Sequence, residues 1–190
     1  LPTPAPAEGL EKALPGGWRA FLSPRSAATV RVVDGQLTIA ARAHTVASLE
    51  RDLPAEATAV ACRVRADGDF GMSWGPGLCL QVGAARVRVG LRSDDRLQTD
   101  RPGDQQLHEG YPKGSWYWLR LRLAGPVIIS EVSRDGNAWT CLRAERLSTL
   151  AGPRRLLLGK VPFDGGRREH SETGEMGTVA VDDVTVYGTA

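Results

Sequence analysis

The sequence predicts an all-β fold in which two antiparallel sheets pack face to face. Polar and apolar residues alternate with a period of two through most of the chain, as expected of strands that cover one side of a core. Two Asp-Gly pairs, at 34–35 and 135–136, separate such stretches and are typical of tight hairpin turns. Helical periodicity is almost absent, so many short strands at this spacing indicate a sandwich or barrel rather than a βαβ fold.

The expected strands follow from this alternation in chain order. The stretch 145–150 is the one place where a helical turn fits the pattern. We expect the N-terminal strands and the closing strand to lie in the same sheet. The expected strands are 29–33, 36–41, 57–66, 77–82, 84–92, 116–123, 126–134, 138–142, 155–161 and 178–187.

Three of these strands divide into an aliphatic face and an arginine face, because successive side chains of a strand point to opposite sides. The segments are 59–66 (AVACRVRA), 84–92 (AARVRVGLR) and 116–123 (WYWLRLRL). We expect the aliphatic faces to form a shared core and the arginine faces to point outward. The candidate ligand-binding residues on these outward faces are Trp116, Trp118, Arg120, Arg122, Arg86 and Arg88.

Length and composition fit one globular domain. The chain has 190 residues, of which 42% are hydrophobic, and this is enough to bury a single core. Residues 1–14 are rich in Pro and Ala and are expected to form an N-terminal linker or extension, followed by a β-sandwich domain over 15–190. The first residue is Leu, as expected of a mature terminus after signal removal or of a clipped chain.

Charge and hydropathy argue against two classes of partner. The formal net charge is only +2, which disfavours a dedicated nucleic-acid binder. No apolar run approaches the ~20 residues that a transmembrane helix needs, so we expect no membrane span.

The three cysteines leave at least one thiol unpaired. Cys62 and Cys79 lie in expected strands and are interpreted as buried thiols that act as small hydrophobic residues. The sequence leaves open whether any two of these and Cys141 form a disulfide. No CxxC pair is present, so zinc and thioredoxin-like sites have no support.

Four segments together resemble the concanavalin A-like lectin/glucanase superfamily, which includes laminin G-like modules. They are DGQLTI (34–39), GSWYWLRLRL (114–123), SRDGNAW (133–139) and VDDVTVYG (181–188). The resemblance implies a jelly-roll sandwich of two antiparallel sheets, one of them concave and often holding a saccharide. It also implies a secreted, periplasmic or cell-surface protein. It does not imply one activity, because this fold carries enzymes, lectins and modules without a ligand.

The resemblance does not extend to the catalytic motif of the β-glucanases. Retaining glycosidases need two carboxylates about 5–5.5 Å apart, and the E-x-D-x-x-E strand that supplies them there is absent here. Glu131 is alone on its strand, and Glu50 with Asp52 is better explained as a solvated strand edge. The polar loop 163–176 places His170 among carboxylates, which fits a metal or acid–base site, but a charged surface loop is the commoner meaning. No catalytic residue is therefore predicted.

Two functions are compatible with these observations, and an enzyme is a third. The first is a non-catalytic, lectin-like carbohydrate-binding module of a larger secreted or cell-surface protein, with neighbouring domains in the parent chain. Arginine forks on its binding face favour anionic glycans. The alternative is a structural or protein-interaction β-sandwich without a sugar site. A glycoside hydrolase comes third because its carboxylate motif is missing.

The closing segment VDDVTVY also resembles the end strand of the β-glucanases. This resemblance implies a structural calcium ion held by the side chain of Asp182 and the carbonyl of Gly35. Calcium takes 6–8 oxygen ligands, and waters complete such a shell.

Overall fold

The computed structural model describes residues 17–22, 27–42, 45–67, 75–92, 95–112, 114–148, 151–161 and 175–188, and these ranges contain strands and no helix. The predicted linker, and the polar loop up to residue 174, lie outside the described residues. The strands are β1 (Trp18–Leu22), β2 (Thr29–Val33), β3 (Gln36–Arg42), β4 (Ala47–Leu53), β5 (Ala57–Asp67), β6 (Pro76–Val82), β7 (Ala85–Leu91), β8 (Arg96–Arg101), β9 (Asp104–Gly110), β10 (Tyr117–Ala124), β11 (Val127–Ser133), β12 (Thr140–Arg146), β13 (Arg154–Lys160) and β14 (Met176–Gly188).

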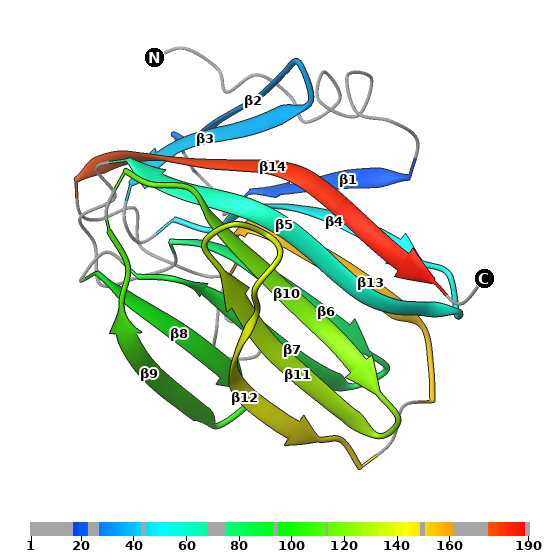
Figure 1. The fold of residues 1–190 in the computed structure, drawn as a ribbon. Coiled ribbons are helices and arrows are strands. Elements are labelled where there is room, and N and C mark those ends of the chain that lie inside the picture. Colours follow the sequence, from blue (N-terminus) through cyan, green and yellow to red (C-terminus); the bar gives the residue numbers. More distant parts are fainter. Residues whose placement is uncertain are drawn as a thin grey trace.

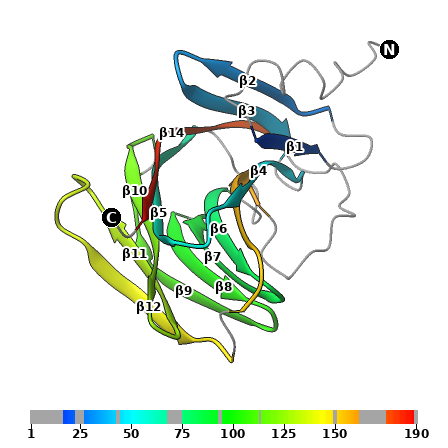
Figure 2. The same ribbon diagram turned by 90° about the vertical axis from the view of Figure 1, so that its right-hand side faces the viewer.

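The strands form two seven-stranded antiparallel sheets that pack face to face (Figures 1 and 2). One sheet, called here the β7 sheet, has the order β1-β4-β13-β6-β7-β8-β9. The other, called here the β10 sheet, has the order β12-β11-β10-β5-β14-β3-β2. The predicted all-β, two-sheet jelly-roll sandwich is confirmed. No helix in the described ranges is long and apolar enough to cross a membrane.

The core lies between the sheets and is built from the predicted aliphatic faces. Leu119 and Leu121 of β10 are fully buried, and Val87, Val89 and Leu91 of β7 face them from the other sheet. Burial of each such side chain contributes about 1.5–3 kcal/mol to folding. The alternation of these strands therefore decides which of their side chains point outward.

The N-terminal hairpin and the closing strand share a sheet, as predicted. Asp34 and Gly35 have φ angles of 51° and 83°, and two positive values in a row are what a tight I′ hairpin turn requires. Strand β14 pairs with both β3 and β5. Strand β1 is not among the expected strands, and it pairs with β4 in the β7 sheet.

One local expectation is wrong, and a second holds only in part. Glu145 and Arg146 end strand β12, so the described part of 145–150 contains no helical turn. Glu50 does not lie on a sheet edge, since β4 runs between β1 and β13 there, whereas Asp52 lies beyond the last residue paired with β1 and its side chain is 60% exposed. Glu50 is only 7% exposed, and Asp52 is paired with Arg155 of β13.

The outer face of the β7 sheet carries a buried ion pair at its centre. Arg88 and Asp100 are register partners on β7 and β8, and their side chains are 2% and 0% exposed. Arg88 Nη1 donates to Asp100 Oδ2 at 3.0 Å, and Nη2 donates to the carbonyl of Gly75 at 3.1 Å. Gln98 Nε2 donates to the second carboxylate oxygen of Asp100. Burial raises the pKa of Asp100, and the charge of Arg88 acts in the opposite direction.

Two glycines make room for this guanidinium. Gly77 of β6 and Gly90 of β7 are register partners beneath it. A Cβ atom on Gly90 would lie 2.5 Å from Arg88 Nη2, and one on Gly77 would lie 2.9 Å from Arg88 Nε. Glycine inside a strand often marks such a close approach. These contacts explain why the strands contain glycines where alternation alone predicts a side chain.

Replacing Arg88→Ala is expected to destabilise the fold by about 3–5 kcal/mol, because it leaves the Asp100 carboxylate buried without its partner. Chemical denaturation measures the change. The matched control is Arg19→Ala, which removes an exposed ion pair with Asp52 and should shift the midpoint little. The double variant Arg88→Leu/Asp100→Leu should recover part of the loss. Equal shifts for the two single variants would contradict this role of the buried pair.

Candidate functional site

The residues predicted to form one ligand surface lie on two different sheets. Arg86 and Arg88 belong to β7, where Arg88 is buried and Arg86 Nε donates to Cys79 Sγ at 3.3 Å. This corrects the expectation of a single outward face, because the structure does not bring this pair together with the rest. The other four predicted residues lie at or directly before β10, in the opposite sheet: Trp116, Trp118, Arg120 and Arg122.

The register of β10 with its neighbours builds the surface around these four residues. Trp118 lies opposite Arg63 of β5, and Arg120 lies opposite Glu131 of β11. Residues opposite each other in an antiparallel pair point to the same side of the sheet. We call this surface the Trp–Arg face; it consists of Trp116, Trp118, Arg120, Arg122, Arg63, Arg65, Glu131 and Trp139.

Guanidinium groups lie against two of the three indole rings. The guanidinium carbons of Arg63 and Arg65 lie 4.7 and 4.8 Å from the centroid of Trp116. Arg120 lies 3.9 Å from the centroid of Trp139. Both rings are half-buried, and cation–π contacts of this kind are attractive by about 0.5–2 kcal/mol. The arginines therefore hold the rings in place on the outer surface.

Glu131 fixes the two arginines of β10. Arg120 Nε donates to its Oε2 at 2.7 Å, and Arg122 Nη2 donates to its Oε1 at 3.2 Å. Burial raises the pKa of Glu131, but the hydrogen bonds and charges of Arg120 and Arg122 outweigh it, so the pKa lies below its ordinary value of 4.5. A carboxyl group with a lowered pKa is ionised near neutral pH and is unsuited to act as a general acid.

A β-bulge in β14 brings two adjacent aspartates onto Arg63. The register with β5 shifts between Asp182 and Thr185, and Asp183 has a φ angle of 50°. Arg63 Nη2 lies 2.8 Å from Asp182 Oδ2, and Arg63 Nε lies 2.8 Å from Asp183 Oδ2. The other oxygen of Asp182 accepts the backbone N–H of Asp183 at 2.8 Å. Both carboxylate oxygens of Asp182 are therefore engaged by the protein.

The predicted calcium ligands lie on β14 and in the turn before its neighbour β3. Gly35 is in the β2–β3 turn, two residues from Leu37, which pairs with Val181 of β14. Because the Arg63 guanidinium already pairs with the Asp182 carboxylate, a cation that binds this carboxylate has to displace it. Among the described residues, no three His, Cys, Asp or Glu side chains gather as a metal site needs. The calcium site stays a prediction.

The turn at 134–138 covers part of Trp118. Gly136 has a φ angle of 77°, and a Cβ atom there would lie 3.0–3.4 Å from the Trp118 indole. Asp135 holds the turn by accepting the backbone N–H groups of Asn137 and Ala138 at 2.8 and 2.9 Å. Trp118 therefore offers less ring surface to a ligand than an uncovered indole on the same strand.

Similarity to known proteins is confined to structure. No protein-family model matches the chain, and no curated protein matches its sequence. A functionally unknown protein from Saccharomyces cerevisiae matches with a TM-score of 0.65 and 12% identity, over 92% of this chain and 97% of that chain. The catalytic domain of an endo-1,3-beta-glucanase (laminarinase) from Thermotoga petrophila RKU-1 matches with a TM-score of 0.59 and 14% identity, over 91% of each chain. The alginate lyase from Klebsiella pneumoniae matches with a TM-score of 0.57 and 10% identity, over 92% of this chain and 96% of that chain.

The chain has a concanavalin A-like fold. This confirms the resemblance seen in its sequence motifs. At these identities the similarity establishes the architecture alone.

Four members of the Trp–Arg face were not among the predicted site residues: Arg63, Arg65, Glu131 and Trp139. Arg63 and Arg65 lie on an arginine face that the alternation of β5 shows, so their outward direction was predictable. Trp139 looks like a packing residue in the sequence, and only the position of β12 beside β11 shows that it meets Arg120. The pairing of strands distant in sequence supplied the missing information.

Among the described residues, the two buried acids on the outer face of the β7 sheet do not form a glycosidase pair. The buried acids there, Glu50 and Asp100, lie on β4 and β8 with three strands between them. Four strand spacings of 4.7–4.9 Å separate them by about 19 Å. Inverting enzymes need about 6.5–9.5 Å and retaining enzymes about 5–5.5 Å. This pair is therefore too far apart for either mechanism.

The cysteines provide no nucleophile in the described core. Cys62, Cys79 and Cys141 are all free thiols. Burial raises the pKa of Cys62 to about 12 and also raises that of Cys79, which keeps both protonated. The interpretation of these two as buried hydrophobic thiols is confirmed, whereas Cys141 is exposed.

Acid is expected to weaken the Trp–Arg face through Glu131. Because its folded pKa is lowered, Glu131 contributes stability above pH 4.5 that is lost as the pH falls through the folded pKa. Thermal unfolding between pH 3 and 7 measures this. The variant Glu131→Gln should be less stable near pH 7 and should lose less stability on acidification than the wild type. Parallel pH profiles for the two proteins would argue against this contribution.

If calcium binds at Asp182 and Gly35, a chelator is expected to lower the thermal stability of the protein. An ion that binds only the folded protein would raise stability by about 2.7 kcal/mol at a hundredfold excess over its Kd. Thermal unfolding with added calcium or with EDTA measures the shift, and Asp182→Asn should abolish it. Arg63→Met is the informative second variant, because it frees the carboxylate. Unfolding that is insensitive to calcium in the wild type and in Arg63→Met would eliminate the site.

Proposed function

We propose that this chain is a non-catalytic carbohydrate-binding module of a larger secreted or cell-surface protein, and that its Trp–Arg face holds the saccharide. One observation carries the proposal: Trp116, Trp118 and Trp139 come together on one outer surface, half-buried, with arginines against two of the rings. Indole rings offer flat apolar surface on which a sugar ring stacks. Fixed guanidinium groups beside them donate hydrogen bonds to hydroxyl or carboxylate groups.

The fold supports the same class of ligand. Two of the structures that the chain resembles carry the names laminarinase and alginate lyase, both enzymes that act on glycans. A catalytic role for this chain has less support than binding. Glu131 has a lowered pKa, and Glu50 and Asp100 are too far apart to cooperate.

The charges on the Trp–Arg face influence whether it binds neutral or anionic glycans. Bidentate arginine favours carboxylate and sulfate groups at close range, so anionic glycans are the favoured class. Each arginine is already paired with a carboxylate, however, and because the two charges cancel, the long-range attraction of an anionic glycan is weak. The four arginines and the four carboxylates that face them are Arg63, Arg65, Arg120, Arg122, Asp67, Asp182, Asp183 and Glu131.

The second candidate is a structural or protein-interaction domain without a sugar site. The pairing of the Trp–Arg face arginines with carboxylates favours this candidate, since a guanidinium that is bound to a carboxylate has fewer donors to offer a ligand. The 134–138 turn on Trp118 favours it as well.

A glycan array of neutral and uronate-containing oligosaccharides, followed by calorimetry, separates the two candidates. Trp116→Ala is expected to weaken binding by about tenfold or more, which is about 1.4 kcal/mol, because it removes the stacking surface. The matched control is Trp18→Ala, since Trp18 is also half-buried beside an arginine but lies in the other sheet. A protein that binds no glycan, or equal losses in the two variants, would exclude the Trp–Arg face as the sugar site.

A further inference from the structure

A fourth aromatic side chain lies on the outer side of the β10 sheet, beyond the Trp–Arg face. Tyr187 of β14 is 44% exposed and is the register partner of Ala59 of β5. Its chain neighbour Val186 packs against the core, so the Tyr187 ring points outward. Strands β14, β5 and β10 lie side by side (Figure 1). Tyr187 therefore extends the same surface that carries the three tryptophans.

Arg122 of β10 lies in the same row as Tyr187. Ala59 is the register partner of both residues, of Arg122 on one side and of Tyr187 on the other. We call Tyr187, Ala59 and Arg122 the Tyr187 row. The two flanking strands are about 10 Å apart, and the side chain between them is short. An aromatic ring and a guanidinium group are thus placed to contact one sugar ring from two sides.

Arg122 keeps one donor that a ligand can reach. Its Nε and Nη2 atoms donate to Glu131 at 3.3 and 3.2 Å. Its Nη1 atom donates to no acceptor among the described residues, and the Arg122 side chain is 41% exposed. This Nη1 atom is not sealed from solvent, in contrast to Nη1 of Arg143. An accessible guanidinium N–H is a donor for a carboxylate or hydroxyl oxygen of a ligand.

Positive charge is in excess at this end of the surface. In the part of the chain that the structure describes, Arg120 and Arg122 share the single carboxylate of Glu131. Near Trp118, in contrast, Arg63 pairs with two aspartates of β14. The charges cancel over the whole face but not locally, and salt screens contacts at close range less than those at long range. A ligand carboxylate is therefore favoured beside Arg122 and disfavoured beside the two aspartates.

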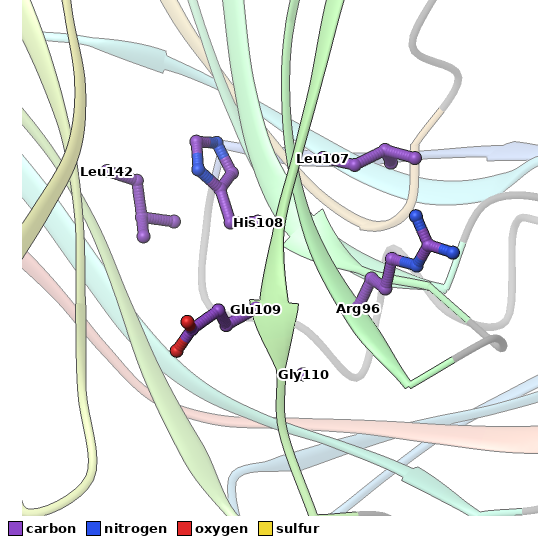
Figure 3. Close-up of a pocket in the computed structure, with 6 residues that line it drawn as sticks. All are labelled: Arg96, Leu107, His108, Glu109, Gly110 and Leu142. Carbon is purple, nitrogen blue, oxygen red and sulfur yellow. The ribbon is translucent and has the colours of Figure 1, made fainter.

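The cleft formed by β8, β9 and β12 offers no such combination. It has a volume of about 630 Å³, and none of the described residues that line it is Trp or Tyr. Figure 3 shows the Glu109 carboxylate on the side of β9 that faces Leu142, with Arg96 on the other side. An acidic sugar would meet this carboxylate without a ring to stack on. The Tyr187 row is therefore the better place for such a sugar.

We propose that the Tyr187 row is an acidic-sugar subsite, in which Tyr187 stacks on a uronate ring and Arg122 Nη1 donates to its carboxylate. This inference rests on the function proposed above and specifies where the charged unit of the glycan binds. The row lies four residues along β10 from Trp118, which is about 14 Å. A glycan that contacts both the tryptophans and the Tyr187 row is therefore a chain longer than a disaccharide.

Calorimetry with tetragalacturonate, and with cellotetraose as a neutral chain of the same length, tests the subsite. Tetragalacturonate is expected to bind more tightly than cellotetraose and more tightly than digalacturonate. Tyr187→Ala and Arg122→Gln should each weaken tetragalacturonate binding by about tenfold or more, because they remove the stacking ring and the charged donor. Arg122→Gln should also reduce the preference for tetragalacturonate over cellotetraose.

Arg31→Gln is the matched control for charge. Arg31 is exposed on β2 of the same sheet and lies opposite Thr38 of β3, so this variant removes one positive charge away from the Tyr187 row. Its binding of tetragalacturonate should equal that of the wild type. Equal losses in Arg31→Gln and Arg122→Gln would overturn the subsite, because they would show a response to net charge alone.

The remaining outcomes separate the subsite from the proposed function. Tetragalacturonate binding that is lost in Trp116→Ala but unchanged in Tyr187→Ala and Arg122→Gln would overturn the subsite and leave the proposed function standing. So would binding of cellotetraose alone, if Trp116→Ala weakens it. Losses in Tyr187→Ala and Arg122→Gln, with full binding in Trp116→Ala, would support the subsite and reject the stacking role of Trp116. Binding of neither chain would overturn the subsite.

Discussion

The pairing of β10 with β5 and β11 is the constraint on which the rest of the structure depends. This pairing points the leucines of β10 toward the core and the alternate residues outward. Its register places Arg120 opposite Glu131 and Trp118 opposite Arg63. A slip by one residue would exchange the two faces and place arginine in the core. The hydrophobic contact between the sheets therefore determines the geometry of the polar surface.

The fold was predictable because most strands carry their pattern locally. Val87, Val89 and Leu91 alternate with polar residues or glycine, and the turn at Asp34-Gly35 has the residues that its positive φ angles require. Strands β8 and β9 lack such a pattern. In β8, Gln98 and Asp100 are polar and yet buried, because Arg88 of the neighbouring strand satisfies the carboxylate. The Arg88–Asp100 ion pair forms only when β7 and β8 are paired, so the sequence of β8 alone does not predict that its polar residues are buried.

The site was predictable only in part, for a related reason. Alternation shows which side chains leave a strand on the same side, but not in which sheet the strand lies. Arg88 and Arg120 therefore look alike in the sequence, although one is buried on the β7 sheet and the other lies beside Trp139 on the β10 sheet. The pairing of Arg63 with Asp182 joins residues 119 positions apart, and the additional pairing with Asp183 depends on a bulge that no local motif indicates.

The arginines of the Trp–Arg face and Arg143 of β12 are paired with carboxylates, but their side chains are exposed to different extents. On the Trp–Arg face, the buried carboxylate of Glu131 binds Arg120 and Arg122, whose side chains are 20% and 41% exposed, so water competes for the guanidinium groups. A ligand there gains mainly from ring stacking and from close hydrogen bonds. Between the edges of the two sheets, Arg143 of β12 is nearly buried and pairs with Asp104 of β9 and with Glu145. Arg120 and Arg122 therefore keep part of their side chains exposed, whereas Arg143 mainly holds β12 against β9.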